Sequence, residues 1–271
     1  MIGPMPPLAI CVPTLLDDPM QLDATALATA IGASRDAGFD AIGLWAFHVA
    51  FGGPDAEKAV DDGGLPVATL DAALSWVDGP SDTAHREIDD LLTLAERLDC
   101  RVVHATTLGP VADRGAARDG YASIAERAEA AGMVLGLEFL PWTGIPTLAA
   151  ANHIAEHGGP AAGILLDTWH WVRQPGGPDL DLLRTLPGER ITSVQLSDAA
   201  PTPAAEVEPE AMTARLLPGD GVVEHTALWA ALAAIGATPV IAAEVMSSDL
   251  VATGAAPMAA AVHRAARSVL P

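Results

Sequence analysis

Eight short apolar runs recur along the chain, and longer segments with helical spacing of their apolar residues separate them. Each run is four to seven residues long and mostly apolar without alternation, which is typical of a parallel strand buried on both faces. Strands that alternate with helices predict a parallel sheet, and eight such units favour a closed (β/α)8 TIM barrel of the α/β class. The predicted strands are Leu8–Val12, Ala41–Leu44, Pro66–Leu70, Arg101–Ala105, Met133–Phe139, Gly163–Asp167, Ile191–Leu196 and Val240–Val245.

The length of the chain fits one such barrel. It has 271 residues, and a (β/α)8 barrel typically needs ~250. No linker, charge block or low-complexity tract divides it, so we expect a single domain over residues 1–271. The longest irregular stretch is the loop Ala199–Pro218 after the seventh strand, and long loops in compact domains are usually functional or mobile.

The charge of the chain limits its partners. The formal net charge is −21, with 14 Lys plus Arg, so the surface repels nucleic-acid phosphates and anionic lipid headgroups. We therefore expect a small-molecule substrate, no nucleic-acid partner and no membrane partner. Because Lys58 is the only lysine and stands in a polar Asp/Gly segment, a mechanism that needs a catalytic lysine is not expected.

Two further features bear on the compartment. The N-terminus lacks the basic and long apolar regions of a secretory signal, and no apolar run reaches the length of a membrane span. Cys11 and Cys100 lie in apolar, strand-like runs and are predicted to be buried free thiols in a reducing environment. We expect a cytoplasmic protein.

Polar residues stand at the ends of four consecutive predicted strands. Glu138, Asp167 and Glu244 each end an apolar run, and Gln195 lies near the end of the seventh run. The carboxyl ends of barrel strands meet at one mouth, and a carboxylate buried there is costly unless it is paired or bound to a metal. The four side chains therefore predict one divalent ion, and their oxygen ligands favour Mn²⁺ or Mg²⁺.

Other polar and aromatic residues lie near the same strand ends and are candidate substrate contacts. A structural role stays open for each: a capping or packing histidine, a surface arginine, a turn aspartate or a tryptophan packed at the rim. The candidates are His170, Arg215, His104, Trp142, Trp169, His48 and Asp198.

The second half of the chain, from about Met133 to Val245, resembles the xylose-isomerase-like superfamily of sugar phosphate isomerases and epimerases. The resemblance rests on the strand-ending Glu138, on the sequences Asp-Thr-Trp-His and Val-Gln-Leu-Ser-Asp, and on Ala-Glu-Val around Glu244. The first half is similar only in the rhythm of its strands. Relatives include ketose 3-epimerases, inosose dehydratases, hydroxypyruvate isomerases and the endonuclease IV type of repair enzyme. In epimerase-like members the metal ligands are Glu, Asp, His and Glu, and here Gln195 stands where the histidine is expected.

The resemblance implies a chemistry for these residues. Glu138 and Glu244 would serve as an acid/base pair as well as metal ligands, while His170 and Arg215 would contact the substrate. The predicted function is a divalent-metal-dependent isomerase or epimerase of a sugar, ketose or cyclic polyol, with proton transfer at a carbon next to a carbonyl. A dehydratase or lyase of a related polyol ketone or natural product is one alternative. A non-catalytic ligand-binding barrel, favoured by Gln195, is another.

Three other classes fit the sequence poorly. A nuclease of the endonuclease IV type needs a basic rim and a histidine-rich zinc site, which a chain with a net charge of −21 does not supply. Metal-free aldolase barrels often need a lysine and a phosphate-binding glycine loop. Xylose isomerases proper use catalytic lysines and a second metal. The oligomeric state stays open, although homo-oligomers are common among relatives.

Overall fold

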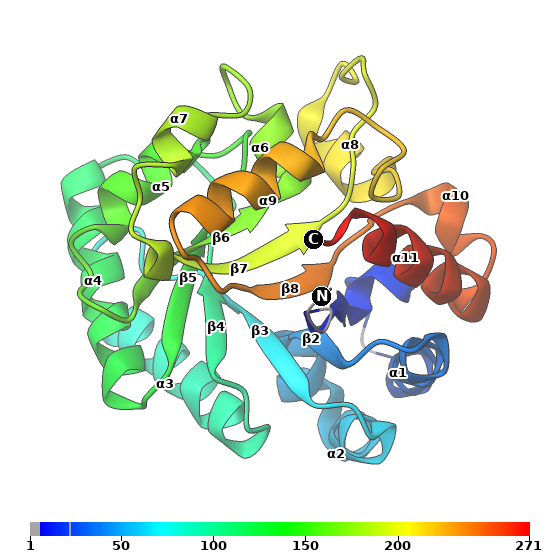
Figure 1. The fold of residues 1–271 in the computed structure, drawn as a ribbon. Coiled ribbons are helices and arrows are strands. Elements are labelled where there is room, and N and C mark those ends of the chain that lie inside the picture. Colours follow the sequence, from blue (N-terminus) through cyan, green and yellow to red (C-terminus); the bar gives the residue numbers. More distant parts are fainter. Residues whose placement is uncertain (1–5, 22) are drawn as a thin grey trace.

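The computed structural model of the protein describes residues 6–21 and 23–271, and the strands form the predicted closed barrel. All eight strands are parallel and pair in chain order, with β1 closing the ring against β8 (Figure 1). The prediction of a single (β/α)8 barrel is confirmed. The strands are β1 (Ala9–Cys11), β2 (Ala41–Trp45), β3 (Val67–Ala73), β4 (Val102–Ala105), β5 (Val134–Glu138), β6 (Ala162–Asp167), β7 (Ile191–Leu196) and β8 (Val240–Ala243).

Helices surround the strands, and α1 packs against α11 (Figure 1). Arg267 of α11 donates to the backbone oxygen of Pro6 at 2.8 Å, so the two ends of the described chain lie close together. The helices are α1 (Ala24–Ala37), α2 (Ala46–Gly63), α3 (Asp82–Arg97), α4 (Arg114–Ala130), α5 (Leu148–Ala155), α6 (Thr168–Arg173), α7 (Leu180–Leu183), α8 (Val207–Thr213), α9 (His225–Ala234), α10 (Ser248–Val251) and α11 (Ala255–Val269). Two short 3-10 turns are η1 (Val12–Leu15) and η2 (Gly188–Arg190).

Local sequence signals explain where several helices begin and end. The carboxylate of Asp23 accepts hydrogen bonds from the first turn of α1, and Ser81 and Asp113 cap α3 and α4 in the same way. Gly38 ends α1 with a φ of 93°, a left-handed conformation that glycine adopts without steric cost.

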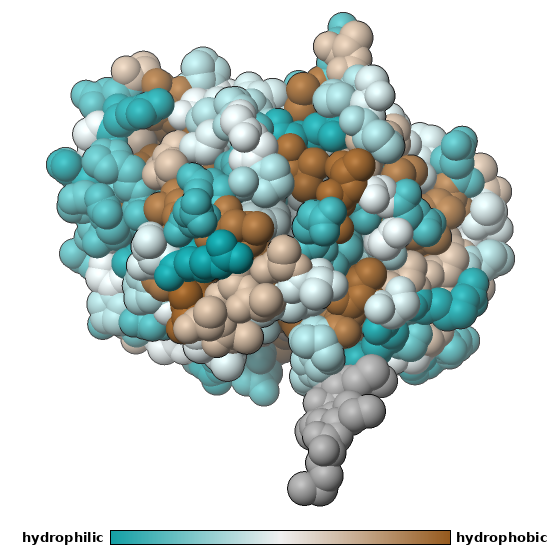
Figure 2. Space-filling model, turned by 45° about the horizontal axis from the view of Figure 1, so that its top comes forward, coloured by the Kyte–Doolittle hydropathy of each residue, from teal (hydrophilic) through white to brown (hydrophobic). Residues whose placement is uncertain are grey.

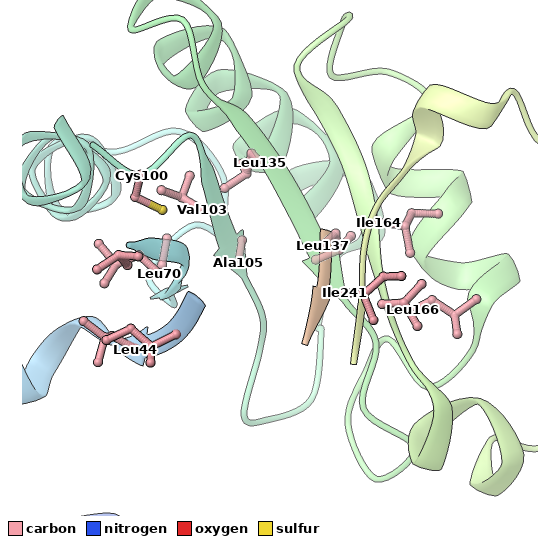
Figure 3. Packing of buried hydrophobic residues seen from close by; sticks show 14 of the residues in the cluster. Leu44, Leu70, Cys100, Val103, Ala105, Leu135, Leu137, Ile164, Leu166 and Ile241 are labelled. Atoms are coloured by element: carbon pink, nitrogen blue, oxygen red, sulfur yellow. The ribbon is translucent and has the colours of Figure 1, made fainter. Parts of the chain in front are cut away.

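The main core lies between the strands and the helices. Figure 3 shows apolar side chains from neighbouring strands in this layer, among them Leu44 of β2, Leu70 of β3 and Val103 of β4. A separate small cluster of Ala9, Cys11 and Ala242 packs apart from that layer. Parallel strands buried on both faces produce the unbroken apolar runs that predicted them.

The surface is mixed. On the face drawn in Figure 2, apolar patches are separated by hydrophilic residues. Within the described residues, no helix combines the length and the apolar character that crossing a bilayer would require. Both cysteines are free and buried, as predicted.

Candidate metal and substrate site

The predicted carboxylates lie at the carboxyl ends of their strands. Glu138 and Asp167 are the last residues of β5 and β6, and Glu244 directly follows β8. Asp167 pairs in register with Gln195 of β7. Ligand atoms of Glu138, Asp167 and His170 all lie within 4.8 Å of one another. The four strands therefore bring these side chains to one end of the barrel.

Asp167 is held from two sides. Its Oδ1 accepts hydrogen bonds from the backbone N–H groups of Trp169 (2.7 Å) and His170 (3.0 Å), so it also caps α6. Its Oδ2 accepts a hydrogen bond of 2.7 Å from Nη1 of Arg215. Burial favours a higher pKa for Asp167, but the charges of Arg215 and His170 and these hydrogen bonds hold the pKa below its ordinary value.

Glu244 lies on the other side of the same arginine. Nη1 of Arg215 is 3.2 Å from Glu244 Oε2, and Nε2 of Gln195 donates to Glu244 Oε1 at 3.3 Å. Burial raises the pKa of Glu244 well above its ordinary value, the nearby charges of Asp167 and Glu138 add to this, and Arg215 opposes it. The buried setting thus disfavours a negative charge on Glu244 beside Asp167 and Glu138 unless further positive charge is supplied.

Arg215 comes from the end of the long loop that follows β7. Its side chain is buried, and Nε donates to the backbone oxygen of Ala211 at 2.7 Å. Backbone pairing of Ala214 with Ser247 and of Asp198 with Leu216 fixes the segment on both sides of the arginine. The guanidinium predicted to grip a substrate oxygen therefore bridges Asp167 and Glu244 in this structure.

His170 and Trp142 stand next to the carboxylates. His170 Nε2 is 3.4 Å from Glu138 Oε1, and the half-buried Trp142 packs edge-on against the imidazole with ring centroids 5.3 Å apart. Trp169 is fully buried, and the guanidinium carbons of Arg173 and Arg215 each lie 5.6 Å from its ring centroid. Trp142 thus lies half-buried beside His170, whereas Trp169 packs against the two arginines.

Three other candidates make their contacts elsewhere. His48 bonds to the backbone oxygen of Pro19 at 2.7 Å and stacks on Trp45. Asp198 bonds to His225 at 3.3 Å and accepts hydrogen bonds of 2.9 Å from three backbone N–H groups of its own loop. Together these bonds hold the pKa of Asp198 below its ordinary value against the effect of burial. His104 bonds to Asp71 and Ser193 inside the barrel. None of their hydrogen bonds in the described part of the chain reaches Glu138, Asp167 or Glu244.

Two residues near the site were not predicted to belong to it. Nε2 of Gln195 lies 3.3 Å from the sulfur of Cys11, whose thiol pKa is raised by burial and by the charges of Glu244 and Asp71. Asp71 follows Leu70, the last residue of the third predicted run. The rule that found the other carboxylates, a charged residue closing an apolar strand, also applies to Asp71.

The side chains fit a divalent cation. Arg215 bridges Asp167 and Glu244, and the third carboxylate, Glu138, lies beside His170, so a divalent ion would balance the remaining negative charge. The amide oxygen Oε1 of Gln195 is buried and has no hydrogen-bond partner among the described residues, as a potential ligand atom would. Carboxylate and amide oxygens suit Mg²⁺ or Mn²⁺, and the imidazole of His170 adds a nitrogen donor beside them.

Solved structures with the same fold include enzymes that act on sugars. The chain superposes on a fusion of a xylose isomerase-like TIM barrel with 4-hydroxyphenylpyruvate dioxygenase (TM-score 0.80, 20% identity), covering 95% of this chain and 42% of the fusion. A protein named IOLI, solved with a bound zinc atom, gives a TM-score of 0.76 at 17% identity, covering 97% of this chain and 98% of that one. D-allulose 3-epimerase from Methylomonas sp. in complex with D-allulose gives 0.71 at 16% identity, covering 97% of each chain.

Comparison by sequence also identifies the family, although no curated protein matches the chain. The family model described as "Xylose isomerase-like TIM barrel" matches residues 31–268, which is most of the chain. With the closed barrel and the strand-end carboxylates, this match shows that the chain belongs to the xylose isomerase-like TIM barrel family.

Proposed function

We propose that the protein is a divalent-metal-dependent isomerase or epimerase of a sugar, ketose or cyclic polyol. The observation that carries the proposal is the convergence of Glu138, Asp167 and Glu244 at one end of the barrel, with the unpartnered oxygen of Gln195 beside them. The family match and the fold shared with a solved D-allulose 3-epimerase support the same class of reaction.

The reaction removes a proton from a carbon next to a carbonyl and returns it, on the same carbon or a neighbouring one. Mn²⁺ or Mg²⁺, held by Glu138, Asp167, Gln195 and Glu244, would supply Lewis-acid stabilisation of the enediolate oxygens. Glu138 and Glu244 come from β5 and the end of β8, so they reach the reacting carbon from different sides. One takes the proton and the other returns it. His170, 3.4 Å from Glu138, can bond to a neighbouring substrate oxygen.

The test is proton exchange in D2O. Free ketoses, inososes and their phosphates are incubated with the protein and Mn²⁺, and the products are read by NMR after removal of the ion. We expect deuterium to enter the carbon next to the carbonyl of at least one compound. Elemental analysis should find about one divalent ion per chain. Absence of exchange across the panel, or of metal binding at millimolar metal, would contradict the proposal.

Changing Gln195→His should strengthen metal binding. Imidazole is a better ligand than an amide for Mn²⁺, Co²⁺ and Zn²⁺, and Gln195 is buried beside Glu244, so a histidine there would face the same carboxylates. Calorimetric titration of the metal-free variant measures the change, with circular dichroism to check the fold. Unchanged or weaker affinity in a folded variant would mean that residue 195 does not face the ion.

A dehydratase is the second candidate, and the pairing of Glu138 with His170 favours it. A carboxylate and an imidazole 3.4 Å apart place a base and an acid on one side of the site. Removal of a proton followed by loss of a β-hydroxyl needs such a pair, whereas epimerisation needs groups on two faces. The same NMR screen distinguishes the outcomes, because elimination yields an unsaturated ketone and exchange or epimerisation retains every hydroxyl.

A further inference from the structure

A second group of polar side chains lies inside the barrel, separate from the contacts of Arg215. Asp71 of β3, His104 of β4 and Ser193 of β7 form a hydrogen-bonded chain. Nδ1 of His104 bonds to Oδ1 of Asp71, and Nε2 of His104 lies 2.7 Å from Oγ of Ser193. The side chain of His104 is 2% exposed and that of Asp71 is 13% exposed. These hydrogen bonds therefore link a buried serine to the partly exposed side chain of Asp71.

The imidazole of His104 is fixed in this chain. Because a carboxylate only accepts hydrogen bonds, Nδ1 carries the hydrogen that it shares with Asp71. The hydroxyl of Ser193 can donate to Nε2 or accept from it. The ring also occupies space left by a glycine, since a Cβ added at Gly136 would lie 2.9 Å from Cδ2 of His104. With both nitrogens bonded, His104 holds Asp71 in position and has no nitrogen left for a ligand.

The second carboxylate oxygen of Asp71, Oδ2, takes no part in these hydrogen bonds. Oδ2 is buried and has no hydrogen-bond partner in residues 6–21 and 23–271. Buried polar atoms without a partner are uncommon, because each loses its hydration without replacement. Asp71 pairs in register with Trp45, the last residue of β2, so it stands near the mouth end of β3. A hydroxyl group that enters the mouth could donate to Oδ2.

We propose that Asp71 binds a hydroxyl group of the substrate through Oδ2, and that His104 and Ser193 are positioning residues for that carboxylate. This inference rests on the proposed function, because it assumes a polyhydroxylated substrate in the same mouth. The bond selects substrates with a hydroxyl on the β3 side of the barrel, three strands away from Asp167 of β6. Loss of a hydrogen bond to a charged acceptor weakens binding by about tenfold or more.

The experiment follows the ring nitrogens of His104 and His170 by 15N NMR in the full-length protein with Mg²⁺. D-allulose, L-ribulose and myo-inositol are the probes. In the wild type, signals of both histidines should move during the titration with at least one probe. In Asp71→Asn, the His170 signal should move only at about tenfold higher probe concentration, and the His104 signal should not respond. In Ser193→Ala, which retains Asp71, the His104 signal should still respond.

The outcomes separate this inference from the proposed function. A response of His170 without a response of His104 in the wild type overturns the role of Asp71 and leaves the proposed function intact. Equal probe affinity of Asp71→Asn and the wild type overturns it as well. Silence of both histidines with all three probes contradicts the polyol class, and the inference falls with it. If circular dichroism shows that Asp71→Asn does not fold, the wild-type and Ser193→Ala titrations decide the question.

Discussion

The Glu138→Gln variant should fold like the wild type and lose proton-transfer activity by a factor of about 10² to 10⁴. Glutamine keeps the size of the side chain and one oxygen ligand but cannot accept the proton. The fold should survive because Glu138 is partly exposed at the mouth, and within the described residues its one ion-pair contact is with the imidazole of His170 at 3.4 Å. The measurement is the rate of deuterium incorporation by NMR, with a thermal melt of each protein as the check on folding.

The matched control is Glu96→Gln, because Glu96 is an exposed residue of α3 on the outer ring of helices. It makes the same chemical change and should leave the rate unaltered. Glu244→Gln should lose activity to a similar extent, since Glu244 is the second member of the acid/base pair. Proton exchange at the wild-type rate in both active-site variants would place the base elsewhere, with His170 as the next residue to test.

The barrel could be predicted because each strand is apolar on both faces and the runs are short and regular. The predicted bounds of a strand are wrong where a polar residue enters the barrel. β3 continues to Ala73, three residues past the predicted end, because Asp71 interrupts the apolar run. His104 bonds to one oxygen of this carboxylate and is itself held by Ser193, and these contacts join residues of β3, β4 and β7. No periodicity in one segment reports such a contact.

Some features of the candidate site could likewise be predicted from the sequence, and others could not. Parallel topology brings strand ends together, so the convergence of Glu138, Asp167 and Glu244 could be predicted from their positions alone. The place of Arg215 could not, because it depends on how the loop after β7 folds back. Backbone pairing of that loop with Asp198 and Ser247 brings the guanidinium onto the carboxylates, and both pairings are tertiary contacts without a local sequence signal.

The metal-free Arg215→Met variant should be strongly destabilised. Methionine keeps much of the apolar stem but removes the cation that bridges Asp167 and Glu244, at 2.7 and 3.2 Å, in a buried setting. Removing one partner of a buried ion pair typically costs about 3–5 kcal/mol, because it leaves the other charge buried without compensation. For a chain of this size that corresponds to a fall in Tm of the order of 10 °C. Thermal melts in EDTA measure it.

A divalent ion should offset part of that loss, because it supplies positive charge to the same carboxylates. We therefore expect Mn²⁺ to raise the Tm of Arg215→Met by more than it raises the Tm of the wild type. Arg264→Met is the control, since Arg264 is an exposed residue of α11 and its replacement should change stability by no more than about 0.5 kcal/mol. If Arg215→Met and the wild type have the same Tm in EDTA, the guanidinium does not compensate the charge of the buried carboxylates. A variant destabilised in EDTA but indifferent to Mn²⁺ would show instead that these carboxylates do not bind the ion.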